Sequence, residues 1–165
     1  MEIKLIATDI DGVWTDARMY YTDQGDYMKA FSTYDGMAIQ ILKDLKIPVA
    51  ILTSEDTQIV KQRAKKLGIK NVFINETEKL KRMHYLCKKM KIKMKNVAYI
   101  GDDLNDFDLL NNVGLSGAPS NSPILSKFCP DIITEKKGGE GAFREFVDTI
   151  LNMNSVDKIL INIFK

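Results

Sequence analysis

The sequence predicts a doubly wound parallel α/β sheet, and three observations support this fold class. Short segments at 3–8, 49–52, 71–74 and 96–100 alternate with longer segments whose apolar residues recur at helical spacing. The short segments are largely apolar rather than alternating, which is typical of strands buried on both faces of a parallel sheet. Acidic or hydroxyl residues follow three of them, and such sheets carry their functional sites at the carboxyl ends of strands.

The first part of the chain supplies a strand, a hairpin and a helix. The segment 3–8 is the first strand. Aromatic residues within 18–33 flank a turn at Gly25, which indicates a β-hairpin. Apolar residues at helical spacing between Gly36 and Pro48 predict the first helix.

The middle of the chain continues the alternation. The run 49–52 is the second strand, and Asp56 and Gly68 are the expected N-cap and stop of the next helix. A third strand at 71–74 then leads into a helix at 76–90 that has one apolar face.

The last part of the chain completes the sheet. We expect a fourth strand at 96–100, a short helix at 106–112, small outer strands at 113–115 and 131–134, and a final helix at 141–151. Strands that alternate with helices in this way form parallel sheets with helices on both faces.

Composition narrows the class of protein. The 165 residues are enough for one domain with its own core, and we expect a single domain over 1–165. A net charge of +2 gives no field for holding nucleic acid or an anionic membrane. No apolar run approaches a membrane span, and the start of the chain lacks the pattern of a signal peptide. Cys87 and Cys129 form no Cys-x-x-Cys pair, so we expect a reducing, cytoplasmic location.

Carboxylates cluster after two of the predicted strands. Asp9 and Asp11 follow the first strand, and Asp102, Asp103 and Asp106 follow the fourth. Turn chemistry explains either cluster taken alone. Together, at one edge of a sheet, these acids repel one another unless a cation lies among them. Ligands that are all oxygen favour Mg²⁺ over Zn²⁺.

Two further residues point to a phosphate ligand. Thr53 ends the second strand, where its hydroxyl and nearby backbone N–H groups can hold phosphate oxygens. Lys79 stands in the first turn of a predicted helix, where a lysine is unfavourable unless an anion offsets it. His84, the only histidine, borders an apolar face and is expected to pack at the edge of the core. Hence no Ser-His-Asp arrangement is available.

In order along the chain, these residues resemble the four motifs of the haloacid dehalogenase superfamily of phosphatases. The matching residues are Asp9-Ile10-Asp11-Gly12-Val13, Thr53, Lys79 and Gly101-Asp102-Asp103-Leu104-Asn105-Asp106. Residues 9–16, 97–106 and 138–145 further resemble the small capless family of 3-deoxy-2-ulosonate phosphate phosphatases. The resemblance implies a Rossmann-like fold with a hairpin flap at about 18–33, no cap domain, and a C-terminal tail at about 152–165.

The resemblance also implies a role for each site residue. Asp9 would be the nucleophile that becomes an aspartyl phosphate, and Asp11 would act first as acid and then as base. Thr53 and Lys79 would bind the phosphoryl oxygens. A set of acids would hold Mg²⁺: Asp9, Asp11 through its backbone carbonyl, and Asp102, with Asp103 and Asp106 as close supports.

The intervals between the motifs cannot hold a lid domain. Residues 12–52 suffice for a hairpin and one helix, and 80–101 for one helix. A lone subunit would leave the site open to water. The resemblance implies a homotetramer in which hairpins from neighbouring subunits cover each other's sites, and ordinary packing under a flap is the alternative. The hairpin offers four aromatic residues for such an interface: Tyr20, Tyr21, Tyr27 and Phe31.

The sequence departs from the eight-carbon members of that family at one place. Those enzymes usually follow the threonine of the second motif with Gly-Arg, whereas Thr53 is followed by Ser54 and Glu55. An arginine binds a carboxylate with two hydrogen bonds, and a glutamate cannot. With Lys66 one helix further along, this pattern resembles the subgroup that acts on nine-carbon sugar acids. We therefore expect a sialic-acid-type 9-phosphate as substrate, with 3-deoxy-D-manno-octulosonate 8-phosphate as the alternative.

Two rival functions remain open on the residues alone. A two-component receiver domain also places acids, a threonine and a lysine at one sheet edge, but it gives no reason for the cluster at 101–106. A silent assembly module, related to domains attached to sugar-acid cytidylyltransferases, would need none of Asp9, Asp11, Lys79 and Asp102.

Overall fold

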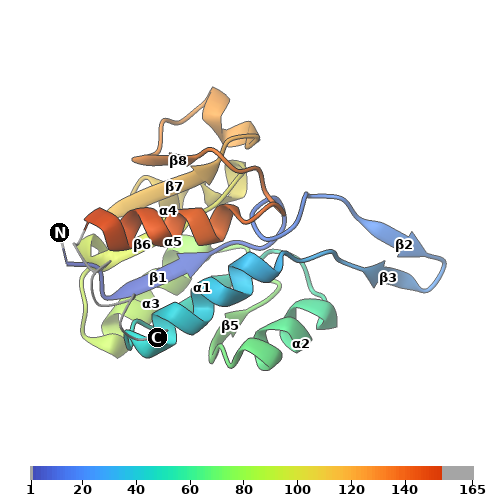
Figure 1. The fold of residues 1–165 in the computed structure, drawn as a ribbon, viewed down its shortest axis with the longest axis horizontal. Helices are drawn as coiled ribbons and strands as arrows, with labels where there is room; N and C mark the ends of the chain where they lie inside the picture. The colour runs from blue at the N-terminus through green and yellow to red at the C-terminus, as the bar shows by residue number, and fades with distance from the viewer. Residues whose placement is uncertain (1, 154–165) are drawn as a thin grey trace.

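Six parallel strands form the central sheet of the computed structural model, which describes residues 2–153 (Figure 1). The sheet order is β5–β4–β1–β6–β7–β8. The strands are β1 Leu5–Thr8, β4 Val49–Leu52, β5 Asn71–Phe73, β6 Val97–Ile100, β7 Leu115–Pro119 and β8 Ile132–Thr134. The chain builds outward from β1 first to one side and then, from β6, to the other. The doubly wound parallel fold is therefore confirmed, and its switch point lies between β1 and β6.

Helices cover both faces of this sheet (Figure 1). They are α1 Thr33–Asp44, α2 Gln58–Leu67, α3 Lys79–Met90, α4 Phe107–Leu110 and α5 Ala142–Met153, with short 3₁₀ turns η1 Met94–Asn96, η2 Leu104–Asp106 and η3 Pro123–Ser126. Alternate residues of β1 enter two separate apolar clusters. Ile6 packs with α1, α2 and α5, whereas Leu5 and Ala7 pack with α3 and α4. Burial on both faces explains why the successive residues Leu5, Ile6 and Ala7 are all apolar.

The predicted hairpin is confirmed, and it projects away from the sheet (Figure 1). Strand β2 (Tyr20–Thr22) pairs antiparallel with β3 (Gly25–Met28). The side chains of Tyr21 and Tyr27 are 62% and 69% exposed. Phe31 was wrongly assigned to this surface. It packs against the core, with the Arg63 guanidinium 5.6 Å from its ring centre.

Several helix ends differ from the prediction. The N-cap of α2 is Thr57 rather than Asp56, because the Thr57 hydroxyl accepts the Ile59 N–H while Asp56 is exposed. Gly68 ends this helix as predicted, with a left-handed φ of 68°. Helix α3 begins at Lys79 instead of residue 76.

Two other predictions concern the C-terminal tail and membrane-spanning helices. Of the predicted tail at 152–165, residues 154–165 lie outside the described residues. Among helices of residues 2–153, none combines the length and apolar character that crossing a membrane requires.

Candidate active site

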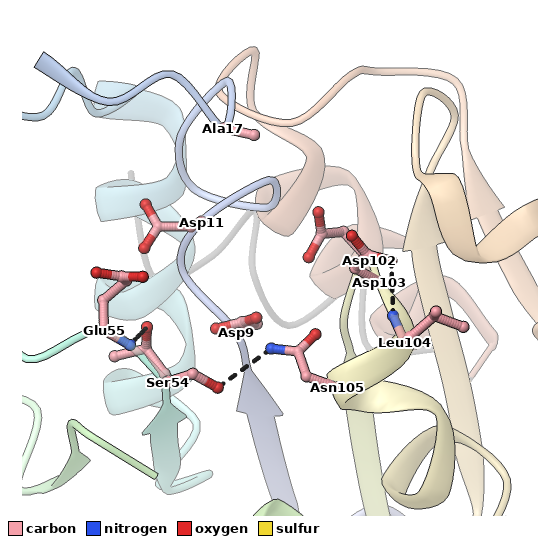
Figure 2. Close-up of a pocket in the computed structure, with 10 residues that line it drawn as sticks. Asp9, Asp11, Ala17, Ser54, Glu55, Asp102, Asp103, Leu104 and Asn105 are labelled. Atoms are coloured by element: carbon pink, nitrogen blue, oxygen red, sulfur yellow. Dashed lines mark hydrogen bonds between the residues drawn. The ribbon is translucent and has the colours of Figure 1, made fainter. Parts of the chain in front are cut away.

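A cavity of about 430 Å³ opens at the carboxyl ends of β1, β4 and β6 (Figure 2). In this view Asp9 lies on its floor, Asp11 and Glu55 lie on one side, and Asp102 and Asn105 lie on the other. The lining residues are Asp9, Asp11, Ala17, Thr53, Ser54, Glu55, Asp102, Asp103, Leu104 and Asn105. The cavity thus lies at the switch point of the sheet, where ligands of doubly wound folds bind.

Trp14 anchors the loop that carries Asp9 and Asp11. Its side chain is fully buried, its indole N–H donates to the Thr8 hydroxyl at 3.0 Å, and its ring lies 4.9 Å from that of Phe143. The backbone N–H groups of residues 13–15 all donate to the carbonyl of residue 10, which closes the loop into one tight turn. The core therefore holds the two aspartates of this loop at the floor and wall of the cavity.

Gly12 allows the loops after β1 and β6 to meet. Its φ of +83° is one that residues with a side chain rarely adopt. A β-carbon at this position would lie 1.8 Å from Oδ2 of Asp102. The missing side chain of Gly12 is therefore what admits the Asp102 carboxylate.

Three buried carboxylates converge in the cavity and its wall. Oxygens of Asp9, Asp102 and Asp106 all lie within 4.8 Å of one another. Burial, with the charge of Asp106 adding to it, raises the pKa of Asp9 to about 7. Burial followed by the charge of Asp9 raises the pKa of Asp102 to about 8. This mutual repulsion of oxygen ligands fits a site for a hard divalent cation.

Asp106 is already fully hydrogen-bonded. Its Oδ1 accepts the Lys79 ammonium at 2.6 Å and the Tyr99 hydroxyl at 2.5 Å. Its Oδ2 accepts the backbone N–H groups of Asp102 and Asp103, at 2.9 and 3.4 Å. Asp106 therefore orients the loop after β6. Of the three acids only Asp9 and Asp102 line the cavity, where a metal could reach their side chains.

Lys79 reaches from the start of α3 into the carboxylate cluster. Its side chain is 1% exposed, and its Nζ lies 2.7 Å from Oδ2 of Asp9 as well as 2.6 Å from Asp106. Burial by itself lowers the pKa of Lys79, but Asp9 and Asp106 outweigh burial and raise it above its ordinary value. The structure thus brings a permanent positive charge to the predicted phosphate site.

The loop after β4 supplies hydroxyl groups to the same cavity. Thr53 is 1% exposed, and its hydroxyl accepts the Glu55 N–H at 3.4 Å. Across the cavity, the amide of Asn105 donates to the Ser54 hydroxyl at 3.2 Å (Figure 2). Sequence reasoning assigned no role to Ser54 or Asn105, although both stand inside the motifs it singled out.

One side chain differs from the predicted arrangement, and the positions of two others can now be given. His84 is exposed on α3 rather than packed at the core edge. Lys66 is exposed in the last turn of α2 and does not line the cavity, so within one subunit it does not join Glu55. Asp103 lines the cavity, and its carboxylate also caps η2 by accepting the Leu104 N–H at 2.7 Å.

Sequence reasoning also missed Lys29. Its side chain is 1% exposed, and its Nζ lies 2.5 Å from Oδ1 of Asp11. The residue directly follows strand β3, which is mostly exposed, so no pattern in the neighbouring residues indicates that Lys29 is buried. Its only cue in the sequence is its position at the end of an aromatic hairpin, next to the motifs.

Comparison with known proteins agrees with this geometry. Residues 26–114 match the family model of haloacid dehalogenase-like hydrolases. The chain is 39% identical, over 149 residues, to the 3-deoxy-D-manno-octulosonate 8-phosphate phosphatase of Haemophilus influenzae, covering 90% of this chain and 83% of that protein. The cobalt-bound form of the Haemophilus influenzae phosphatase superposes with a TM-score of 0.87 at 38% identity, over 92% of this chain and 88% of that one.

A second solved structure is similarly close. The Moraxella catarrhalis phosphatase, in complex with magnesium ion, phosphate ion and its sugar acid, superposes with a TM-score of 0.90. It is 36% identical, and the match covers 98% of this chain and 93% of that one. With the family model, the relatives and the carboxylate cavity in agreement, the chain belongs to the haloacid dehalogenase-like hydrolases, in the family of the 3-deoxy-D-manno-octulosonate 8-phosphate phosphatases.

Proposed function

We propose that this phosphatase hydrolyses the phosphate monoester of a 3-deoxy-2-ulosonate, with 3-deoxy-D-manno-octulosonate 8-phosphate as the preferred substrate. The observation that carries the proposal is the pair of buried carboxylates, Asp9 and Asp102, that line the cavity, with the buried Lys79 ion-paired to Asp9. The relatives named above act on the eight-carbon phosphate, and they support that alternative better than the nine-carbon substrate expected from the sequence.

Asp9 is the proposed nucleophile. Its Oδ1 accepts the Ile10 N–H at 2.7 Å and its Oδ2 accepts Lys79, so the carboxylate has a set orientation. A carboxylate oxygen bonds to phosphorus while the bond from phosphorus to the sugar oxygen breaks. The electron pair leaves with the sugar oxygen, which takes a proton from Asp11.

Water completes the reaction in a second step. Its oxygen bonds to phosphorus, Asp11 takes the proton that water releases, and the bond between phosphorus and Asp9 breaks. The products are inorganic phosphate and the original Asp9 carboxylate. Asp11 lines the cavity beside Asp9, as these two proton transfers require.

The remaining groups neutralise charge. The cofactor is a divalent cation, Mg²⁺, for which Asp9, the Asp11 backbone carbonyl and Asp102 are the proposed ligands; it offsets the repulsion between a carboxylate and a phosphate dianion. Thr53 and Lys79 would hold the phosphoryl oxygens. Asp103 and Asp106 would support this set from the loop after β6, as the hydrogen bonds of Asp106 indicate.

One observation favours the nine-carbon substrate as a second candidate. Glu55 lines the cavity from the loop after β4, where an arginine would serve a substrate carboxylate (Figure 2). Lys66, the other residue of that hypothesis, lies outside the cavity of its own subunit and would have to act at a neighbour's site.

The cavity also motivates the proposed homotetramer. It is open to solvent beside a hairpin whose Tyr21 and Tyr27 are 62% and 69% exposed. Exposed aromatic side chains of this kind are enriched at protein interfaces. Hairpins from neighbouring subunits would then limit access of water to the cavity.

The nucleophile provides the direct test of this function. The Asp9→Asn protein should release phosphate at least about 10³-fold more slowly than the wild type, because the covalent route is lost. Phosphate release from the eight-carbon substrate with Mg²⁺ measures the loss, and circular dichroism checks folding. Near-normal turnover by a folded Asp9→Asn protein would show that Asp9 is not the nucleophile.

A further inference from the structure

Lys29 is a buried cation to which the mechanism above gives no task. It stands at the foot of the hairpin, directly after β3, where Tyr27 and Met28 are exposed. Its own side chain is only 1% exposed. Lysine is almost never fully buried without a partner, because removing its charge from water is costly. Its contacts must therefore account for its burial.

The contacts of Lys29 converge on the proposed acid and base. Its Nζ donates to Oδ1 of Asp11 at 2.5 Å and to the sulfur of Met19 at 3.6 Å. Met19 stands at the other foot of the hairpin, just before β2. The two feet of the hairpin thus hold an ammonium group against one oxygen of Asp11.

The other oxygen of Asp11 is left without a partner. Oδ1 also accepts the Thr15 hydroxyl at 3.3 Å, whereas Oδ2 is buried and makes no hydrogen bond within residues 2–153. Asp11 lines the same cavity as Asp9. One oxygen is therefore anchored, and the second is available to carry a proton.

We propose that Lys29 is a positioning residue that orients Asp11 for proton transfer to the leaving sugar oxygen. The inference rests on the proposed function, in which Asp11 is the acid. Because Lys29 stands at the foot of the hairpin, the position of that foot beside the loop after β1 sets the orientation of the acid. Loss of the ion pair leaves the Asp11 side chain free to rotate away from the leaving group.

This role predicts a dependence on the leaving group. A sugar alkoxide is a poor leaving group and needs the proton, whereas 4-nitrophenolate leaves without one. The parameter kcat/KM reports the steps up to the transfer of the phosphoryl group, so hydrolysis of the aspartyl phosphate does not affect it. A misplaced acid therefore lowers kcat/KM for the sugar phosphate and spares that for 4-nitrophenyl phosphate.

The decisive variant is Lys29→Met, which keeps an unbranched side chain one atom shorter and removes its charge. We expect kcat/KM for the eight-carbon sugar phosphate to fall on the order of 10²-fold, the effect of displacing a reacting group by about 1 Å. For 4-nitrophenyl phosphate we expect a loss of less than about threefold. Arg18→Met is the matched control, because Arg18 is an exposed cation that pairs with Asp16 on the same segment. It should leave both values unchanged.

Two further variants separate positioning from folding. In an Asp11→Asn background, Lys29→Met should cause little additional loss of kcat/KM for the sugar phosphate, because both changes remove the same function, protonation of the leaving group. Lys29→Arg keeps the charge and should retain more activity on the sugar phosphate than Lys29→Met does. Any loss that it causes should again be larger for the sugar phosphate than for 4-nitrophenyl phosphate. If Lys29→Met does not fold, the test is the same comparison in Lys29→Arg: the loss of kcat/KM for the sugar phosphate against the loss for 4-nitrophenyl phosphate.

Equal losses for both substrates in folded Lys29→Met or Lys29→Arg protein would overturn the inference, as would folded Lys29→Met protein that loses activity on neither substrate. Wild-type protein that hydrolyses neither phosphate with Mg²⁺ would instead refute the proposed function.

Discussion

Gly12→Ala tests whether the metal site depends on the close approach of two loops. The new β-carbon would lie 1.8 Å from Oδ2 of Asp102 and 2.4 Å from its Cγ. Ordinary contact begins at 3.4 Å, so the oxygen must retreat by about 1.6 Å, the difference between the two distances. Metal–ligand distances tolerate only about 0.2 Å. The proposed ligand Asp102 would therefore lie too far from the metal to bind it.

The expected cost is larger for activity than for stability. Displacing a group at the reaction centre by 1 Å or more lowers the rate on the order of 10²-fold. The left-handed backbone adds about 1–2 kcal/mol of strain to the folded protein. Titration of activity with Mg²⁺ and calorimetry of Mg²⁺ binding measure the first effect, and urea unfolding measures the second.

Gly25→Ala is the matched control for this variant. Gly25 also has a positive φ, +108°, but a β-carbon there meets no atom within 4 Å. It should show the backbone strain and keep normal Mg²⁺ affinity and turnover. A Gly12→Ala protein with the Mg²⁺ affinity and activity of Gly25→Ala would refute the argument that the bare Gly12 admits Asp102.

Three further predictions concern the metal, the assembly and the substrate. Since the pKa values of Asp9 and Asp102 are raised to about 7 and 8, the folded metal-free protein keeps protons that unfolded carboxyls release near pH 4. Its free energy of unfolding should therefore fall between about pH 4 and pH 8. Mg²⁺ should raise Tm more at pH 8 than at pH 5, and equal increases in Tm at the two pH values would contradict this. If the proposed tetramer forms, replacing Tyr21 and Tyr27 with Glu should dissociate it and raise KM more than it lowers kcat. Light scattering that finds a fully active wild-type monomer would rule the tetramer out. Glu55→Arg should shift the kcat/KM ratio toward the eight-carbon substrate by roughly tenfold, and an unchanged ratio would remove Glu55 from specificity.

Local patterns in the sequence predicted most of the fold. Strand β1 is recognisable because burial on both faces requires consecutive apolar residues, as in Leu5-Ile6-Ala7. Gly68 marks the end of α2 because a left-handed residue ends many helices. The alternation of such segments implies a parallel sheet, and that sheet places Asp9 and Asp102 at one edge. The strands, the helix ends and the sheet edge that carries the acids therefore follow from patterns within short stretches of the sequence.

The tertiary structure decided which side chains surround those acids. Lys29 reaches Asp11 only because the foot of the hairpin lies beside the loop after β1, and no periodicity in the sequence reports that contact. Asp106 is expected from the sequence only as a support beside the metal ligands, and the folded chain shows its partners: donors from β6, α3 and its own loop occupy both its oxygens. Phe31 belongs by sequence to an exposed hairpin, yet it packs on the core.

The physical reason for this division is the range of the interactions. Hydrophobic periodicity and capping act over a few neighbouring residues, so the sequence by itself determined the strands, the helices and the two acidic loops. Ion pairs and hydrogen bonds within the cavity depend on distances between segments far apart in the chain. Two contacts set those distances. Trp14 packs against Phe143, and Gly12, which has no side chain, lets the Asp102 carboxylate come close. Only the folded chain therefore decided that Asp9, Lys79 and Asp106 form one connected network, with Lys29 joined to Asp11 beside it.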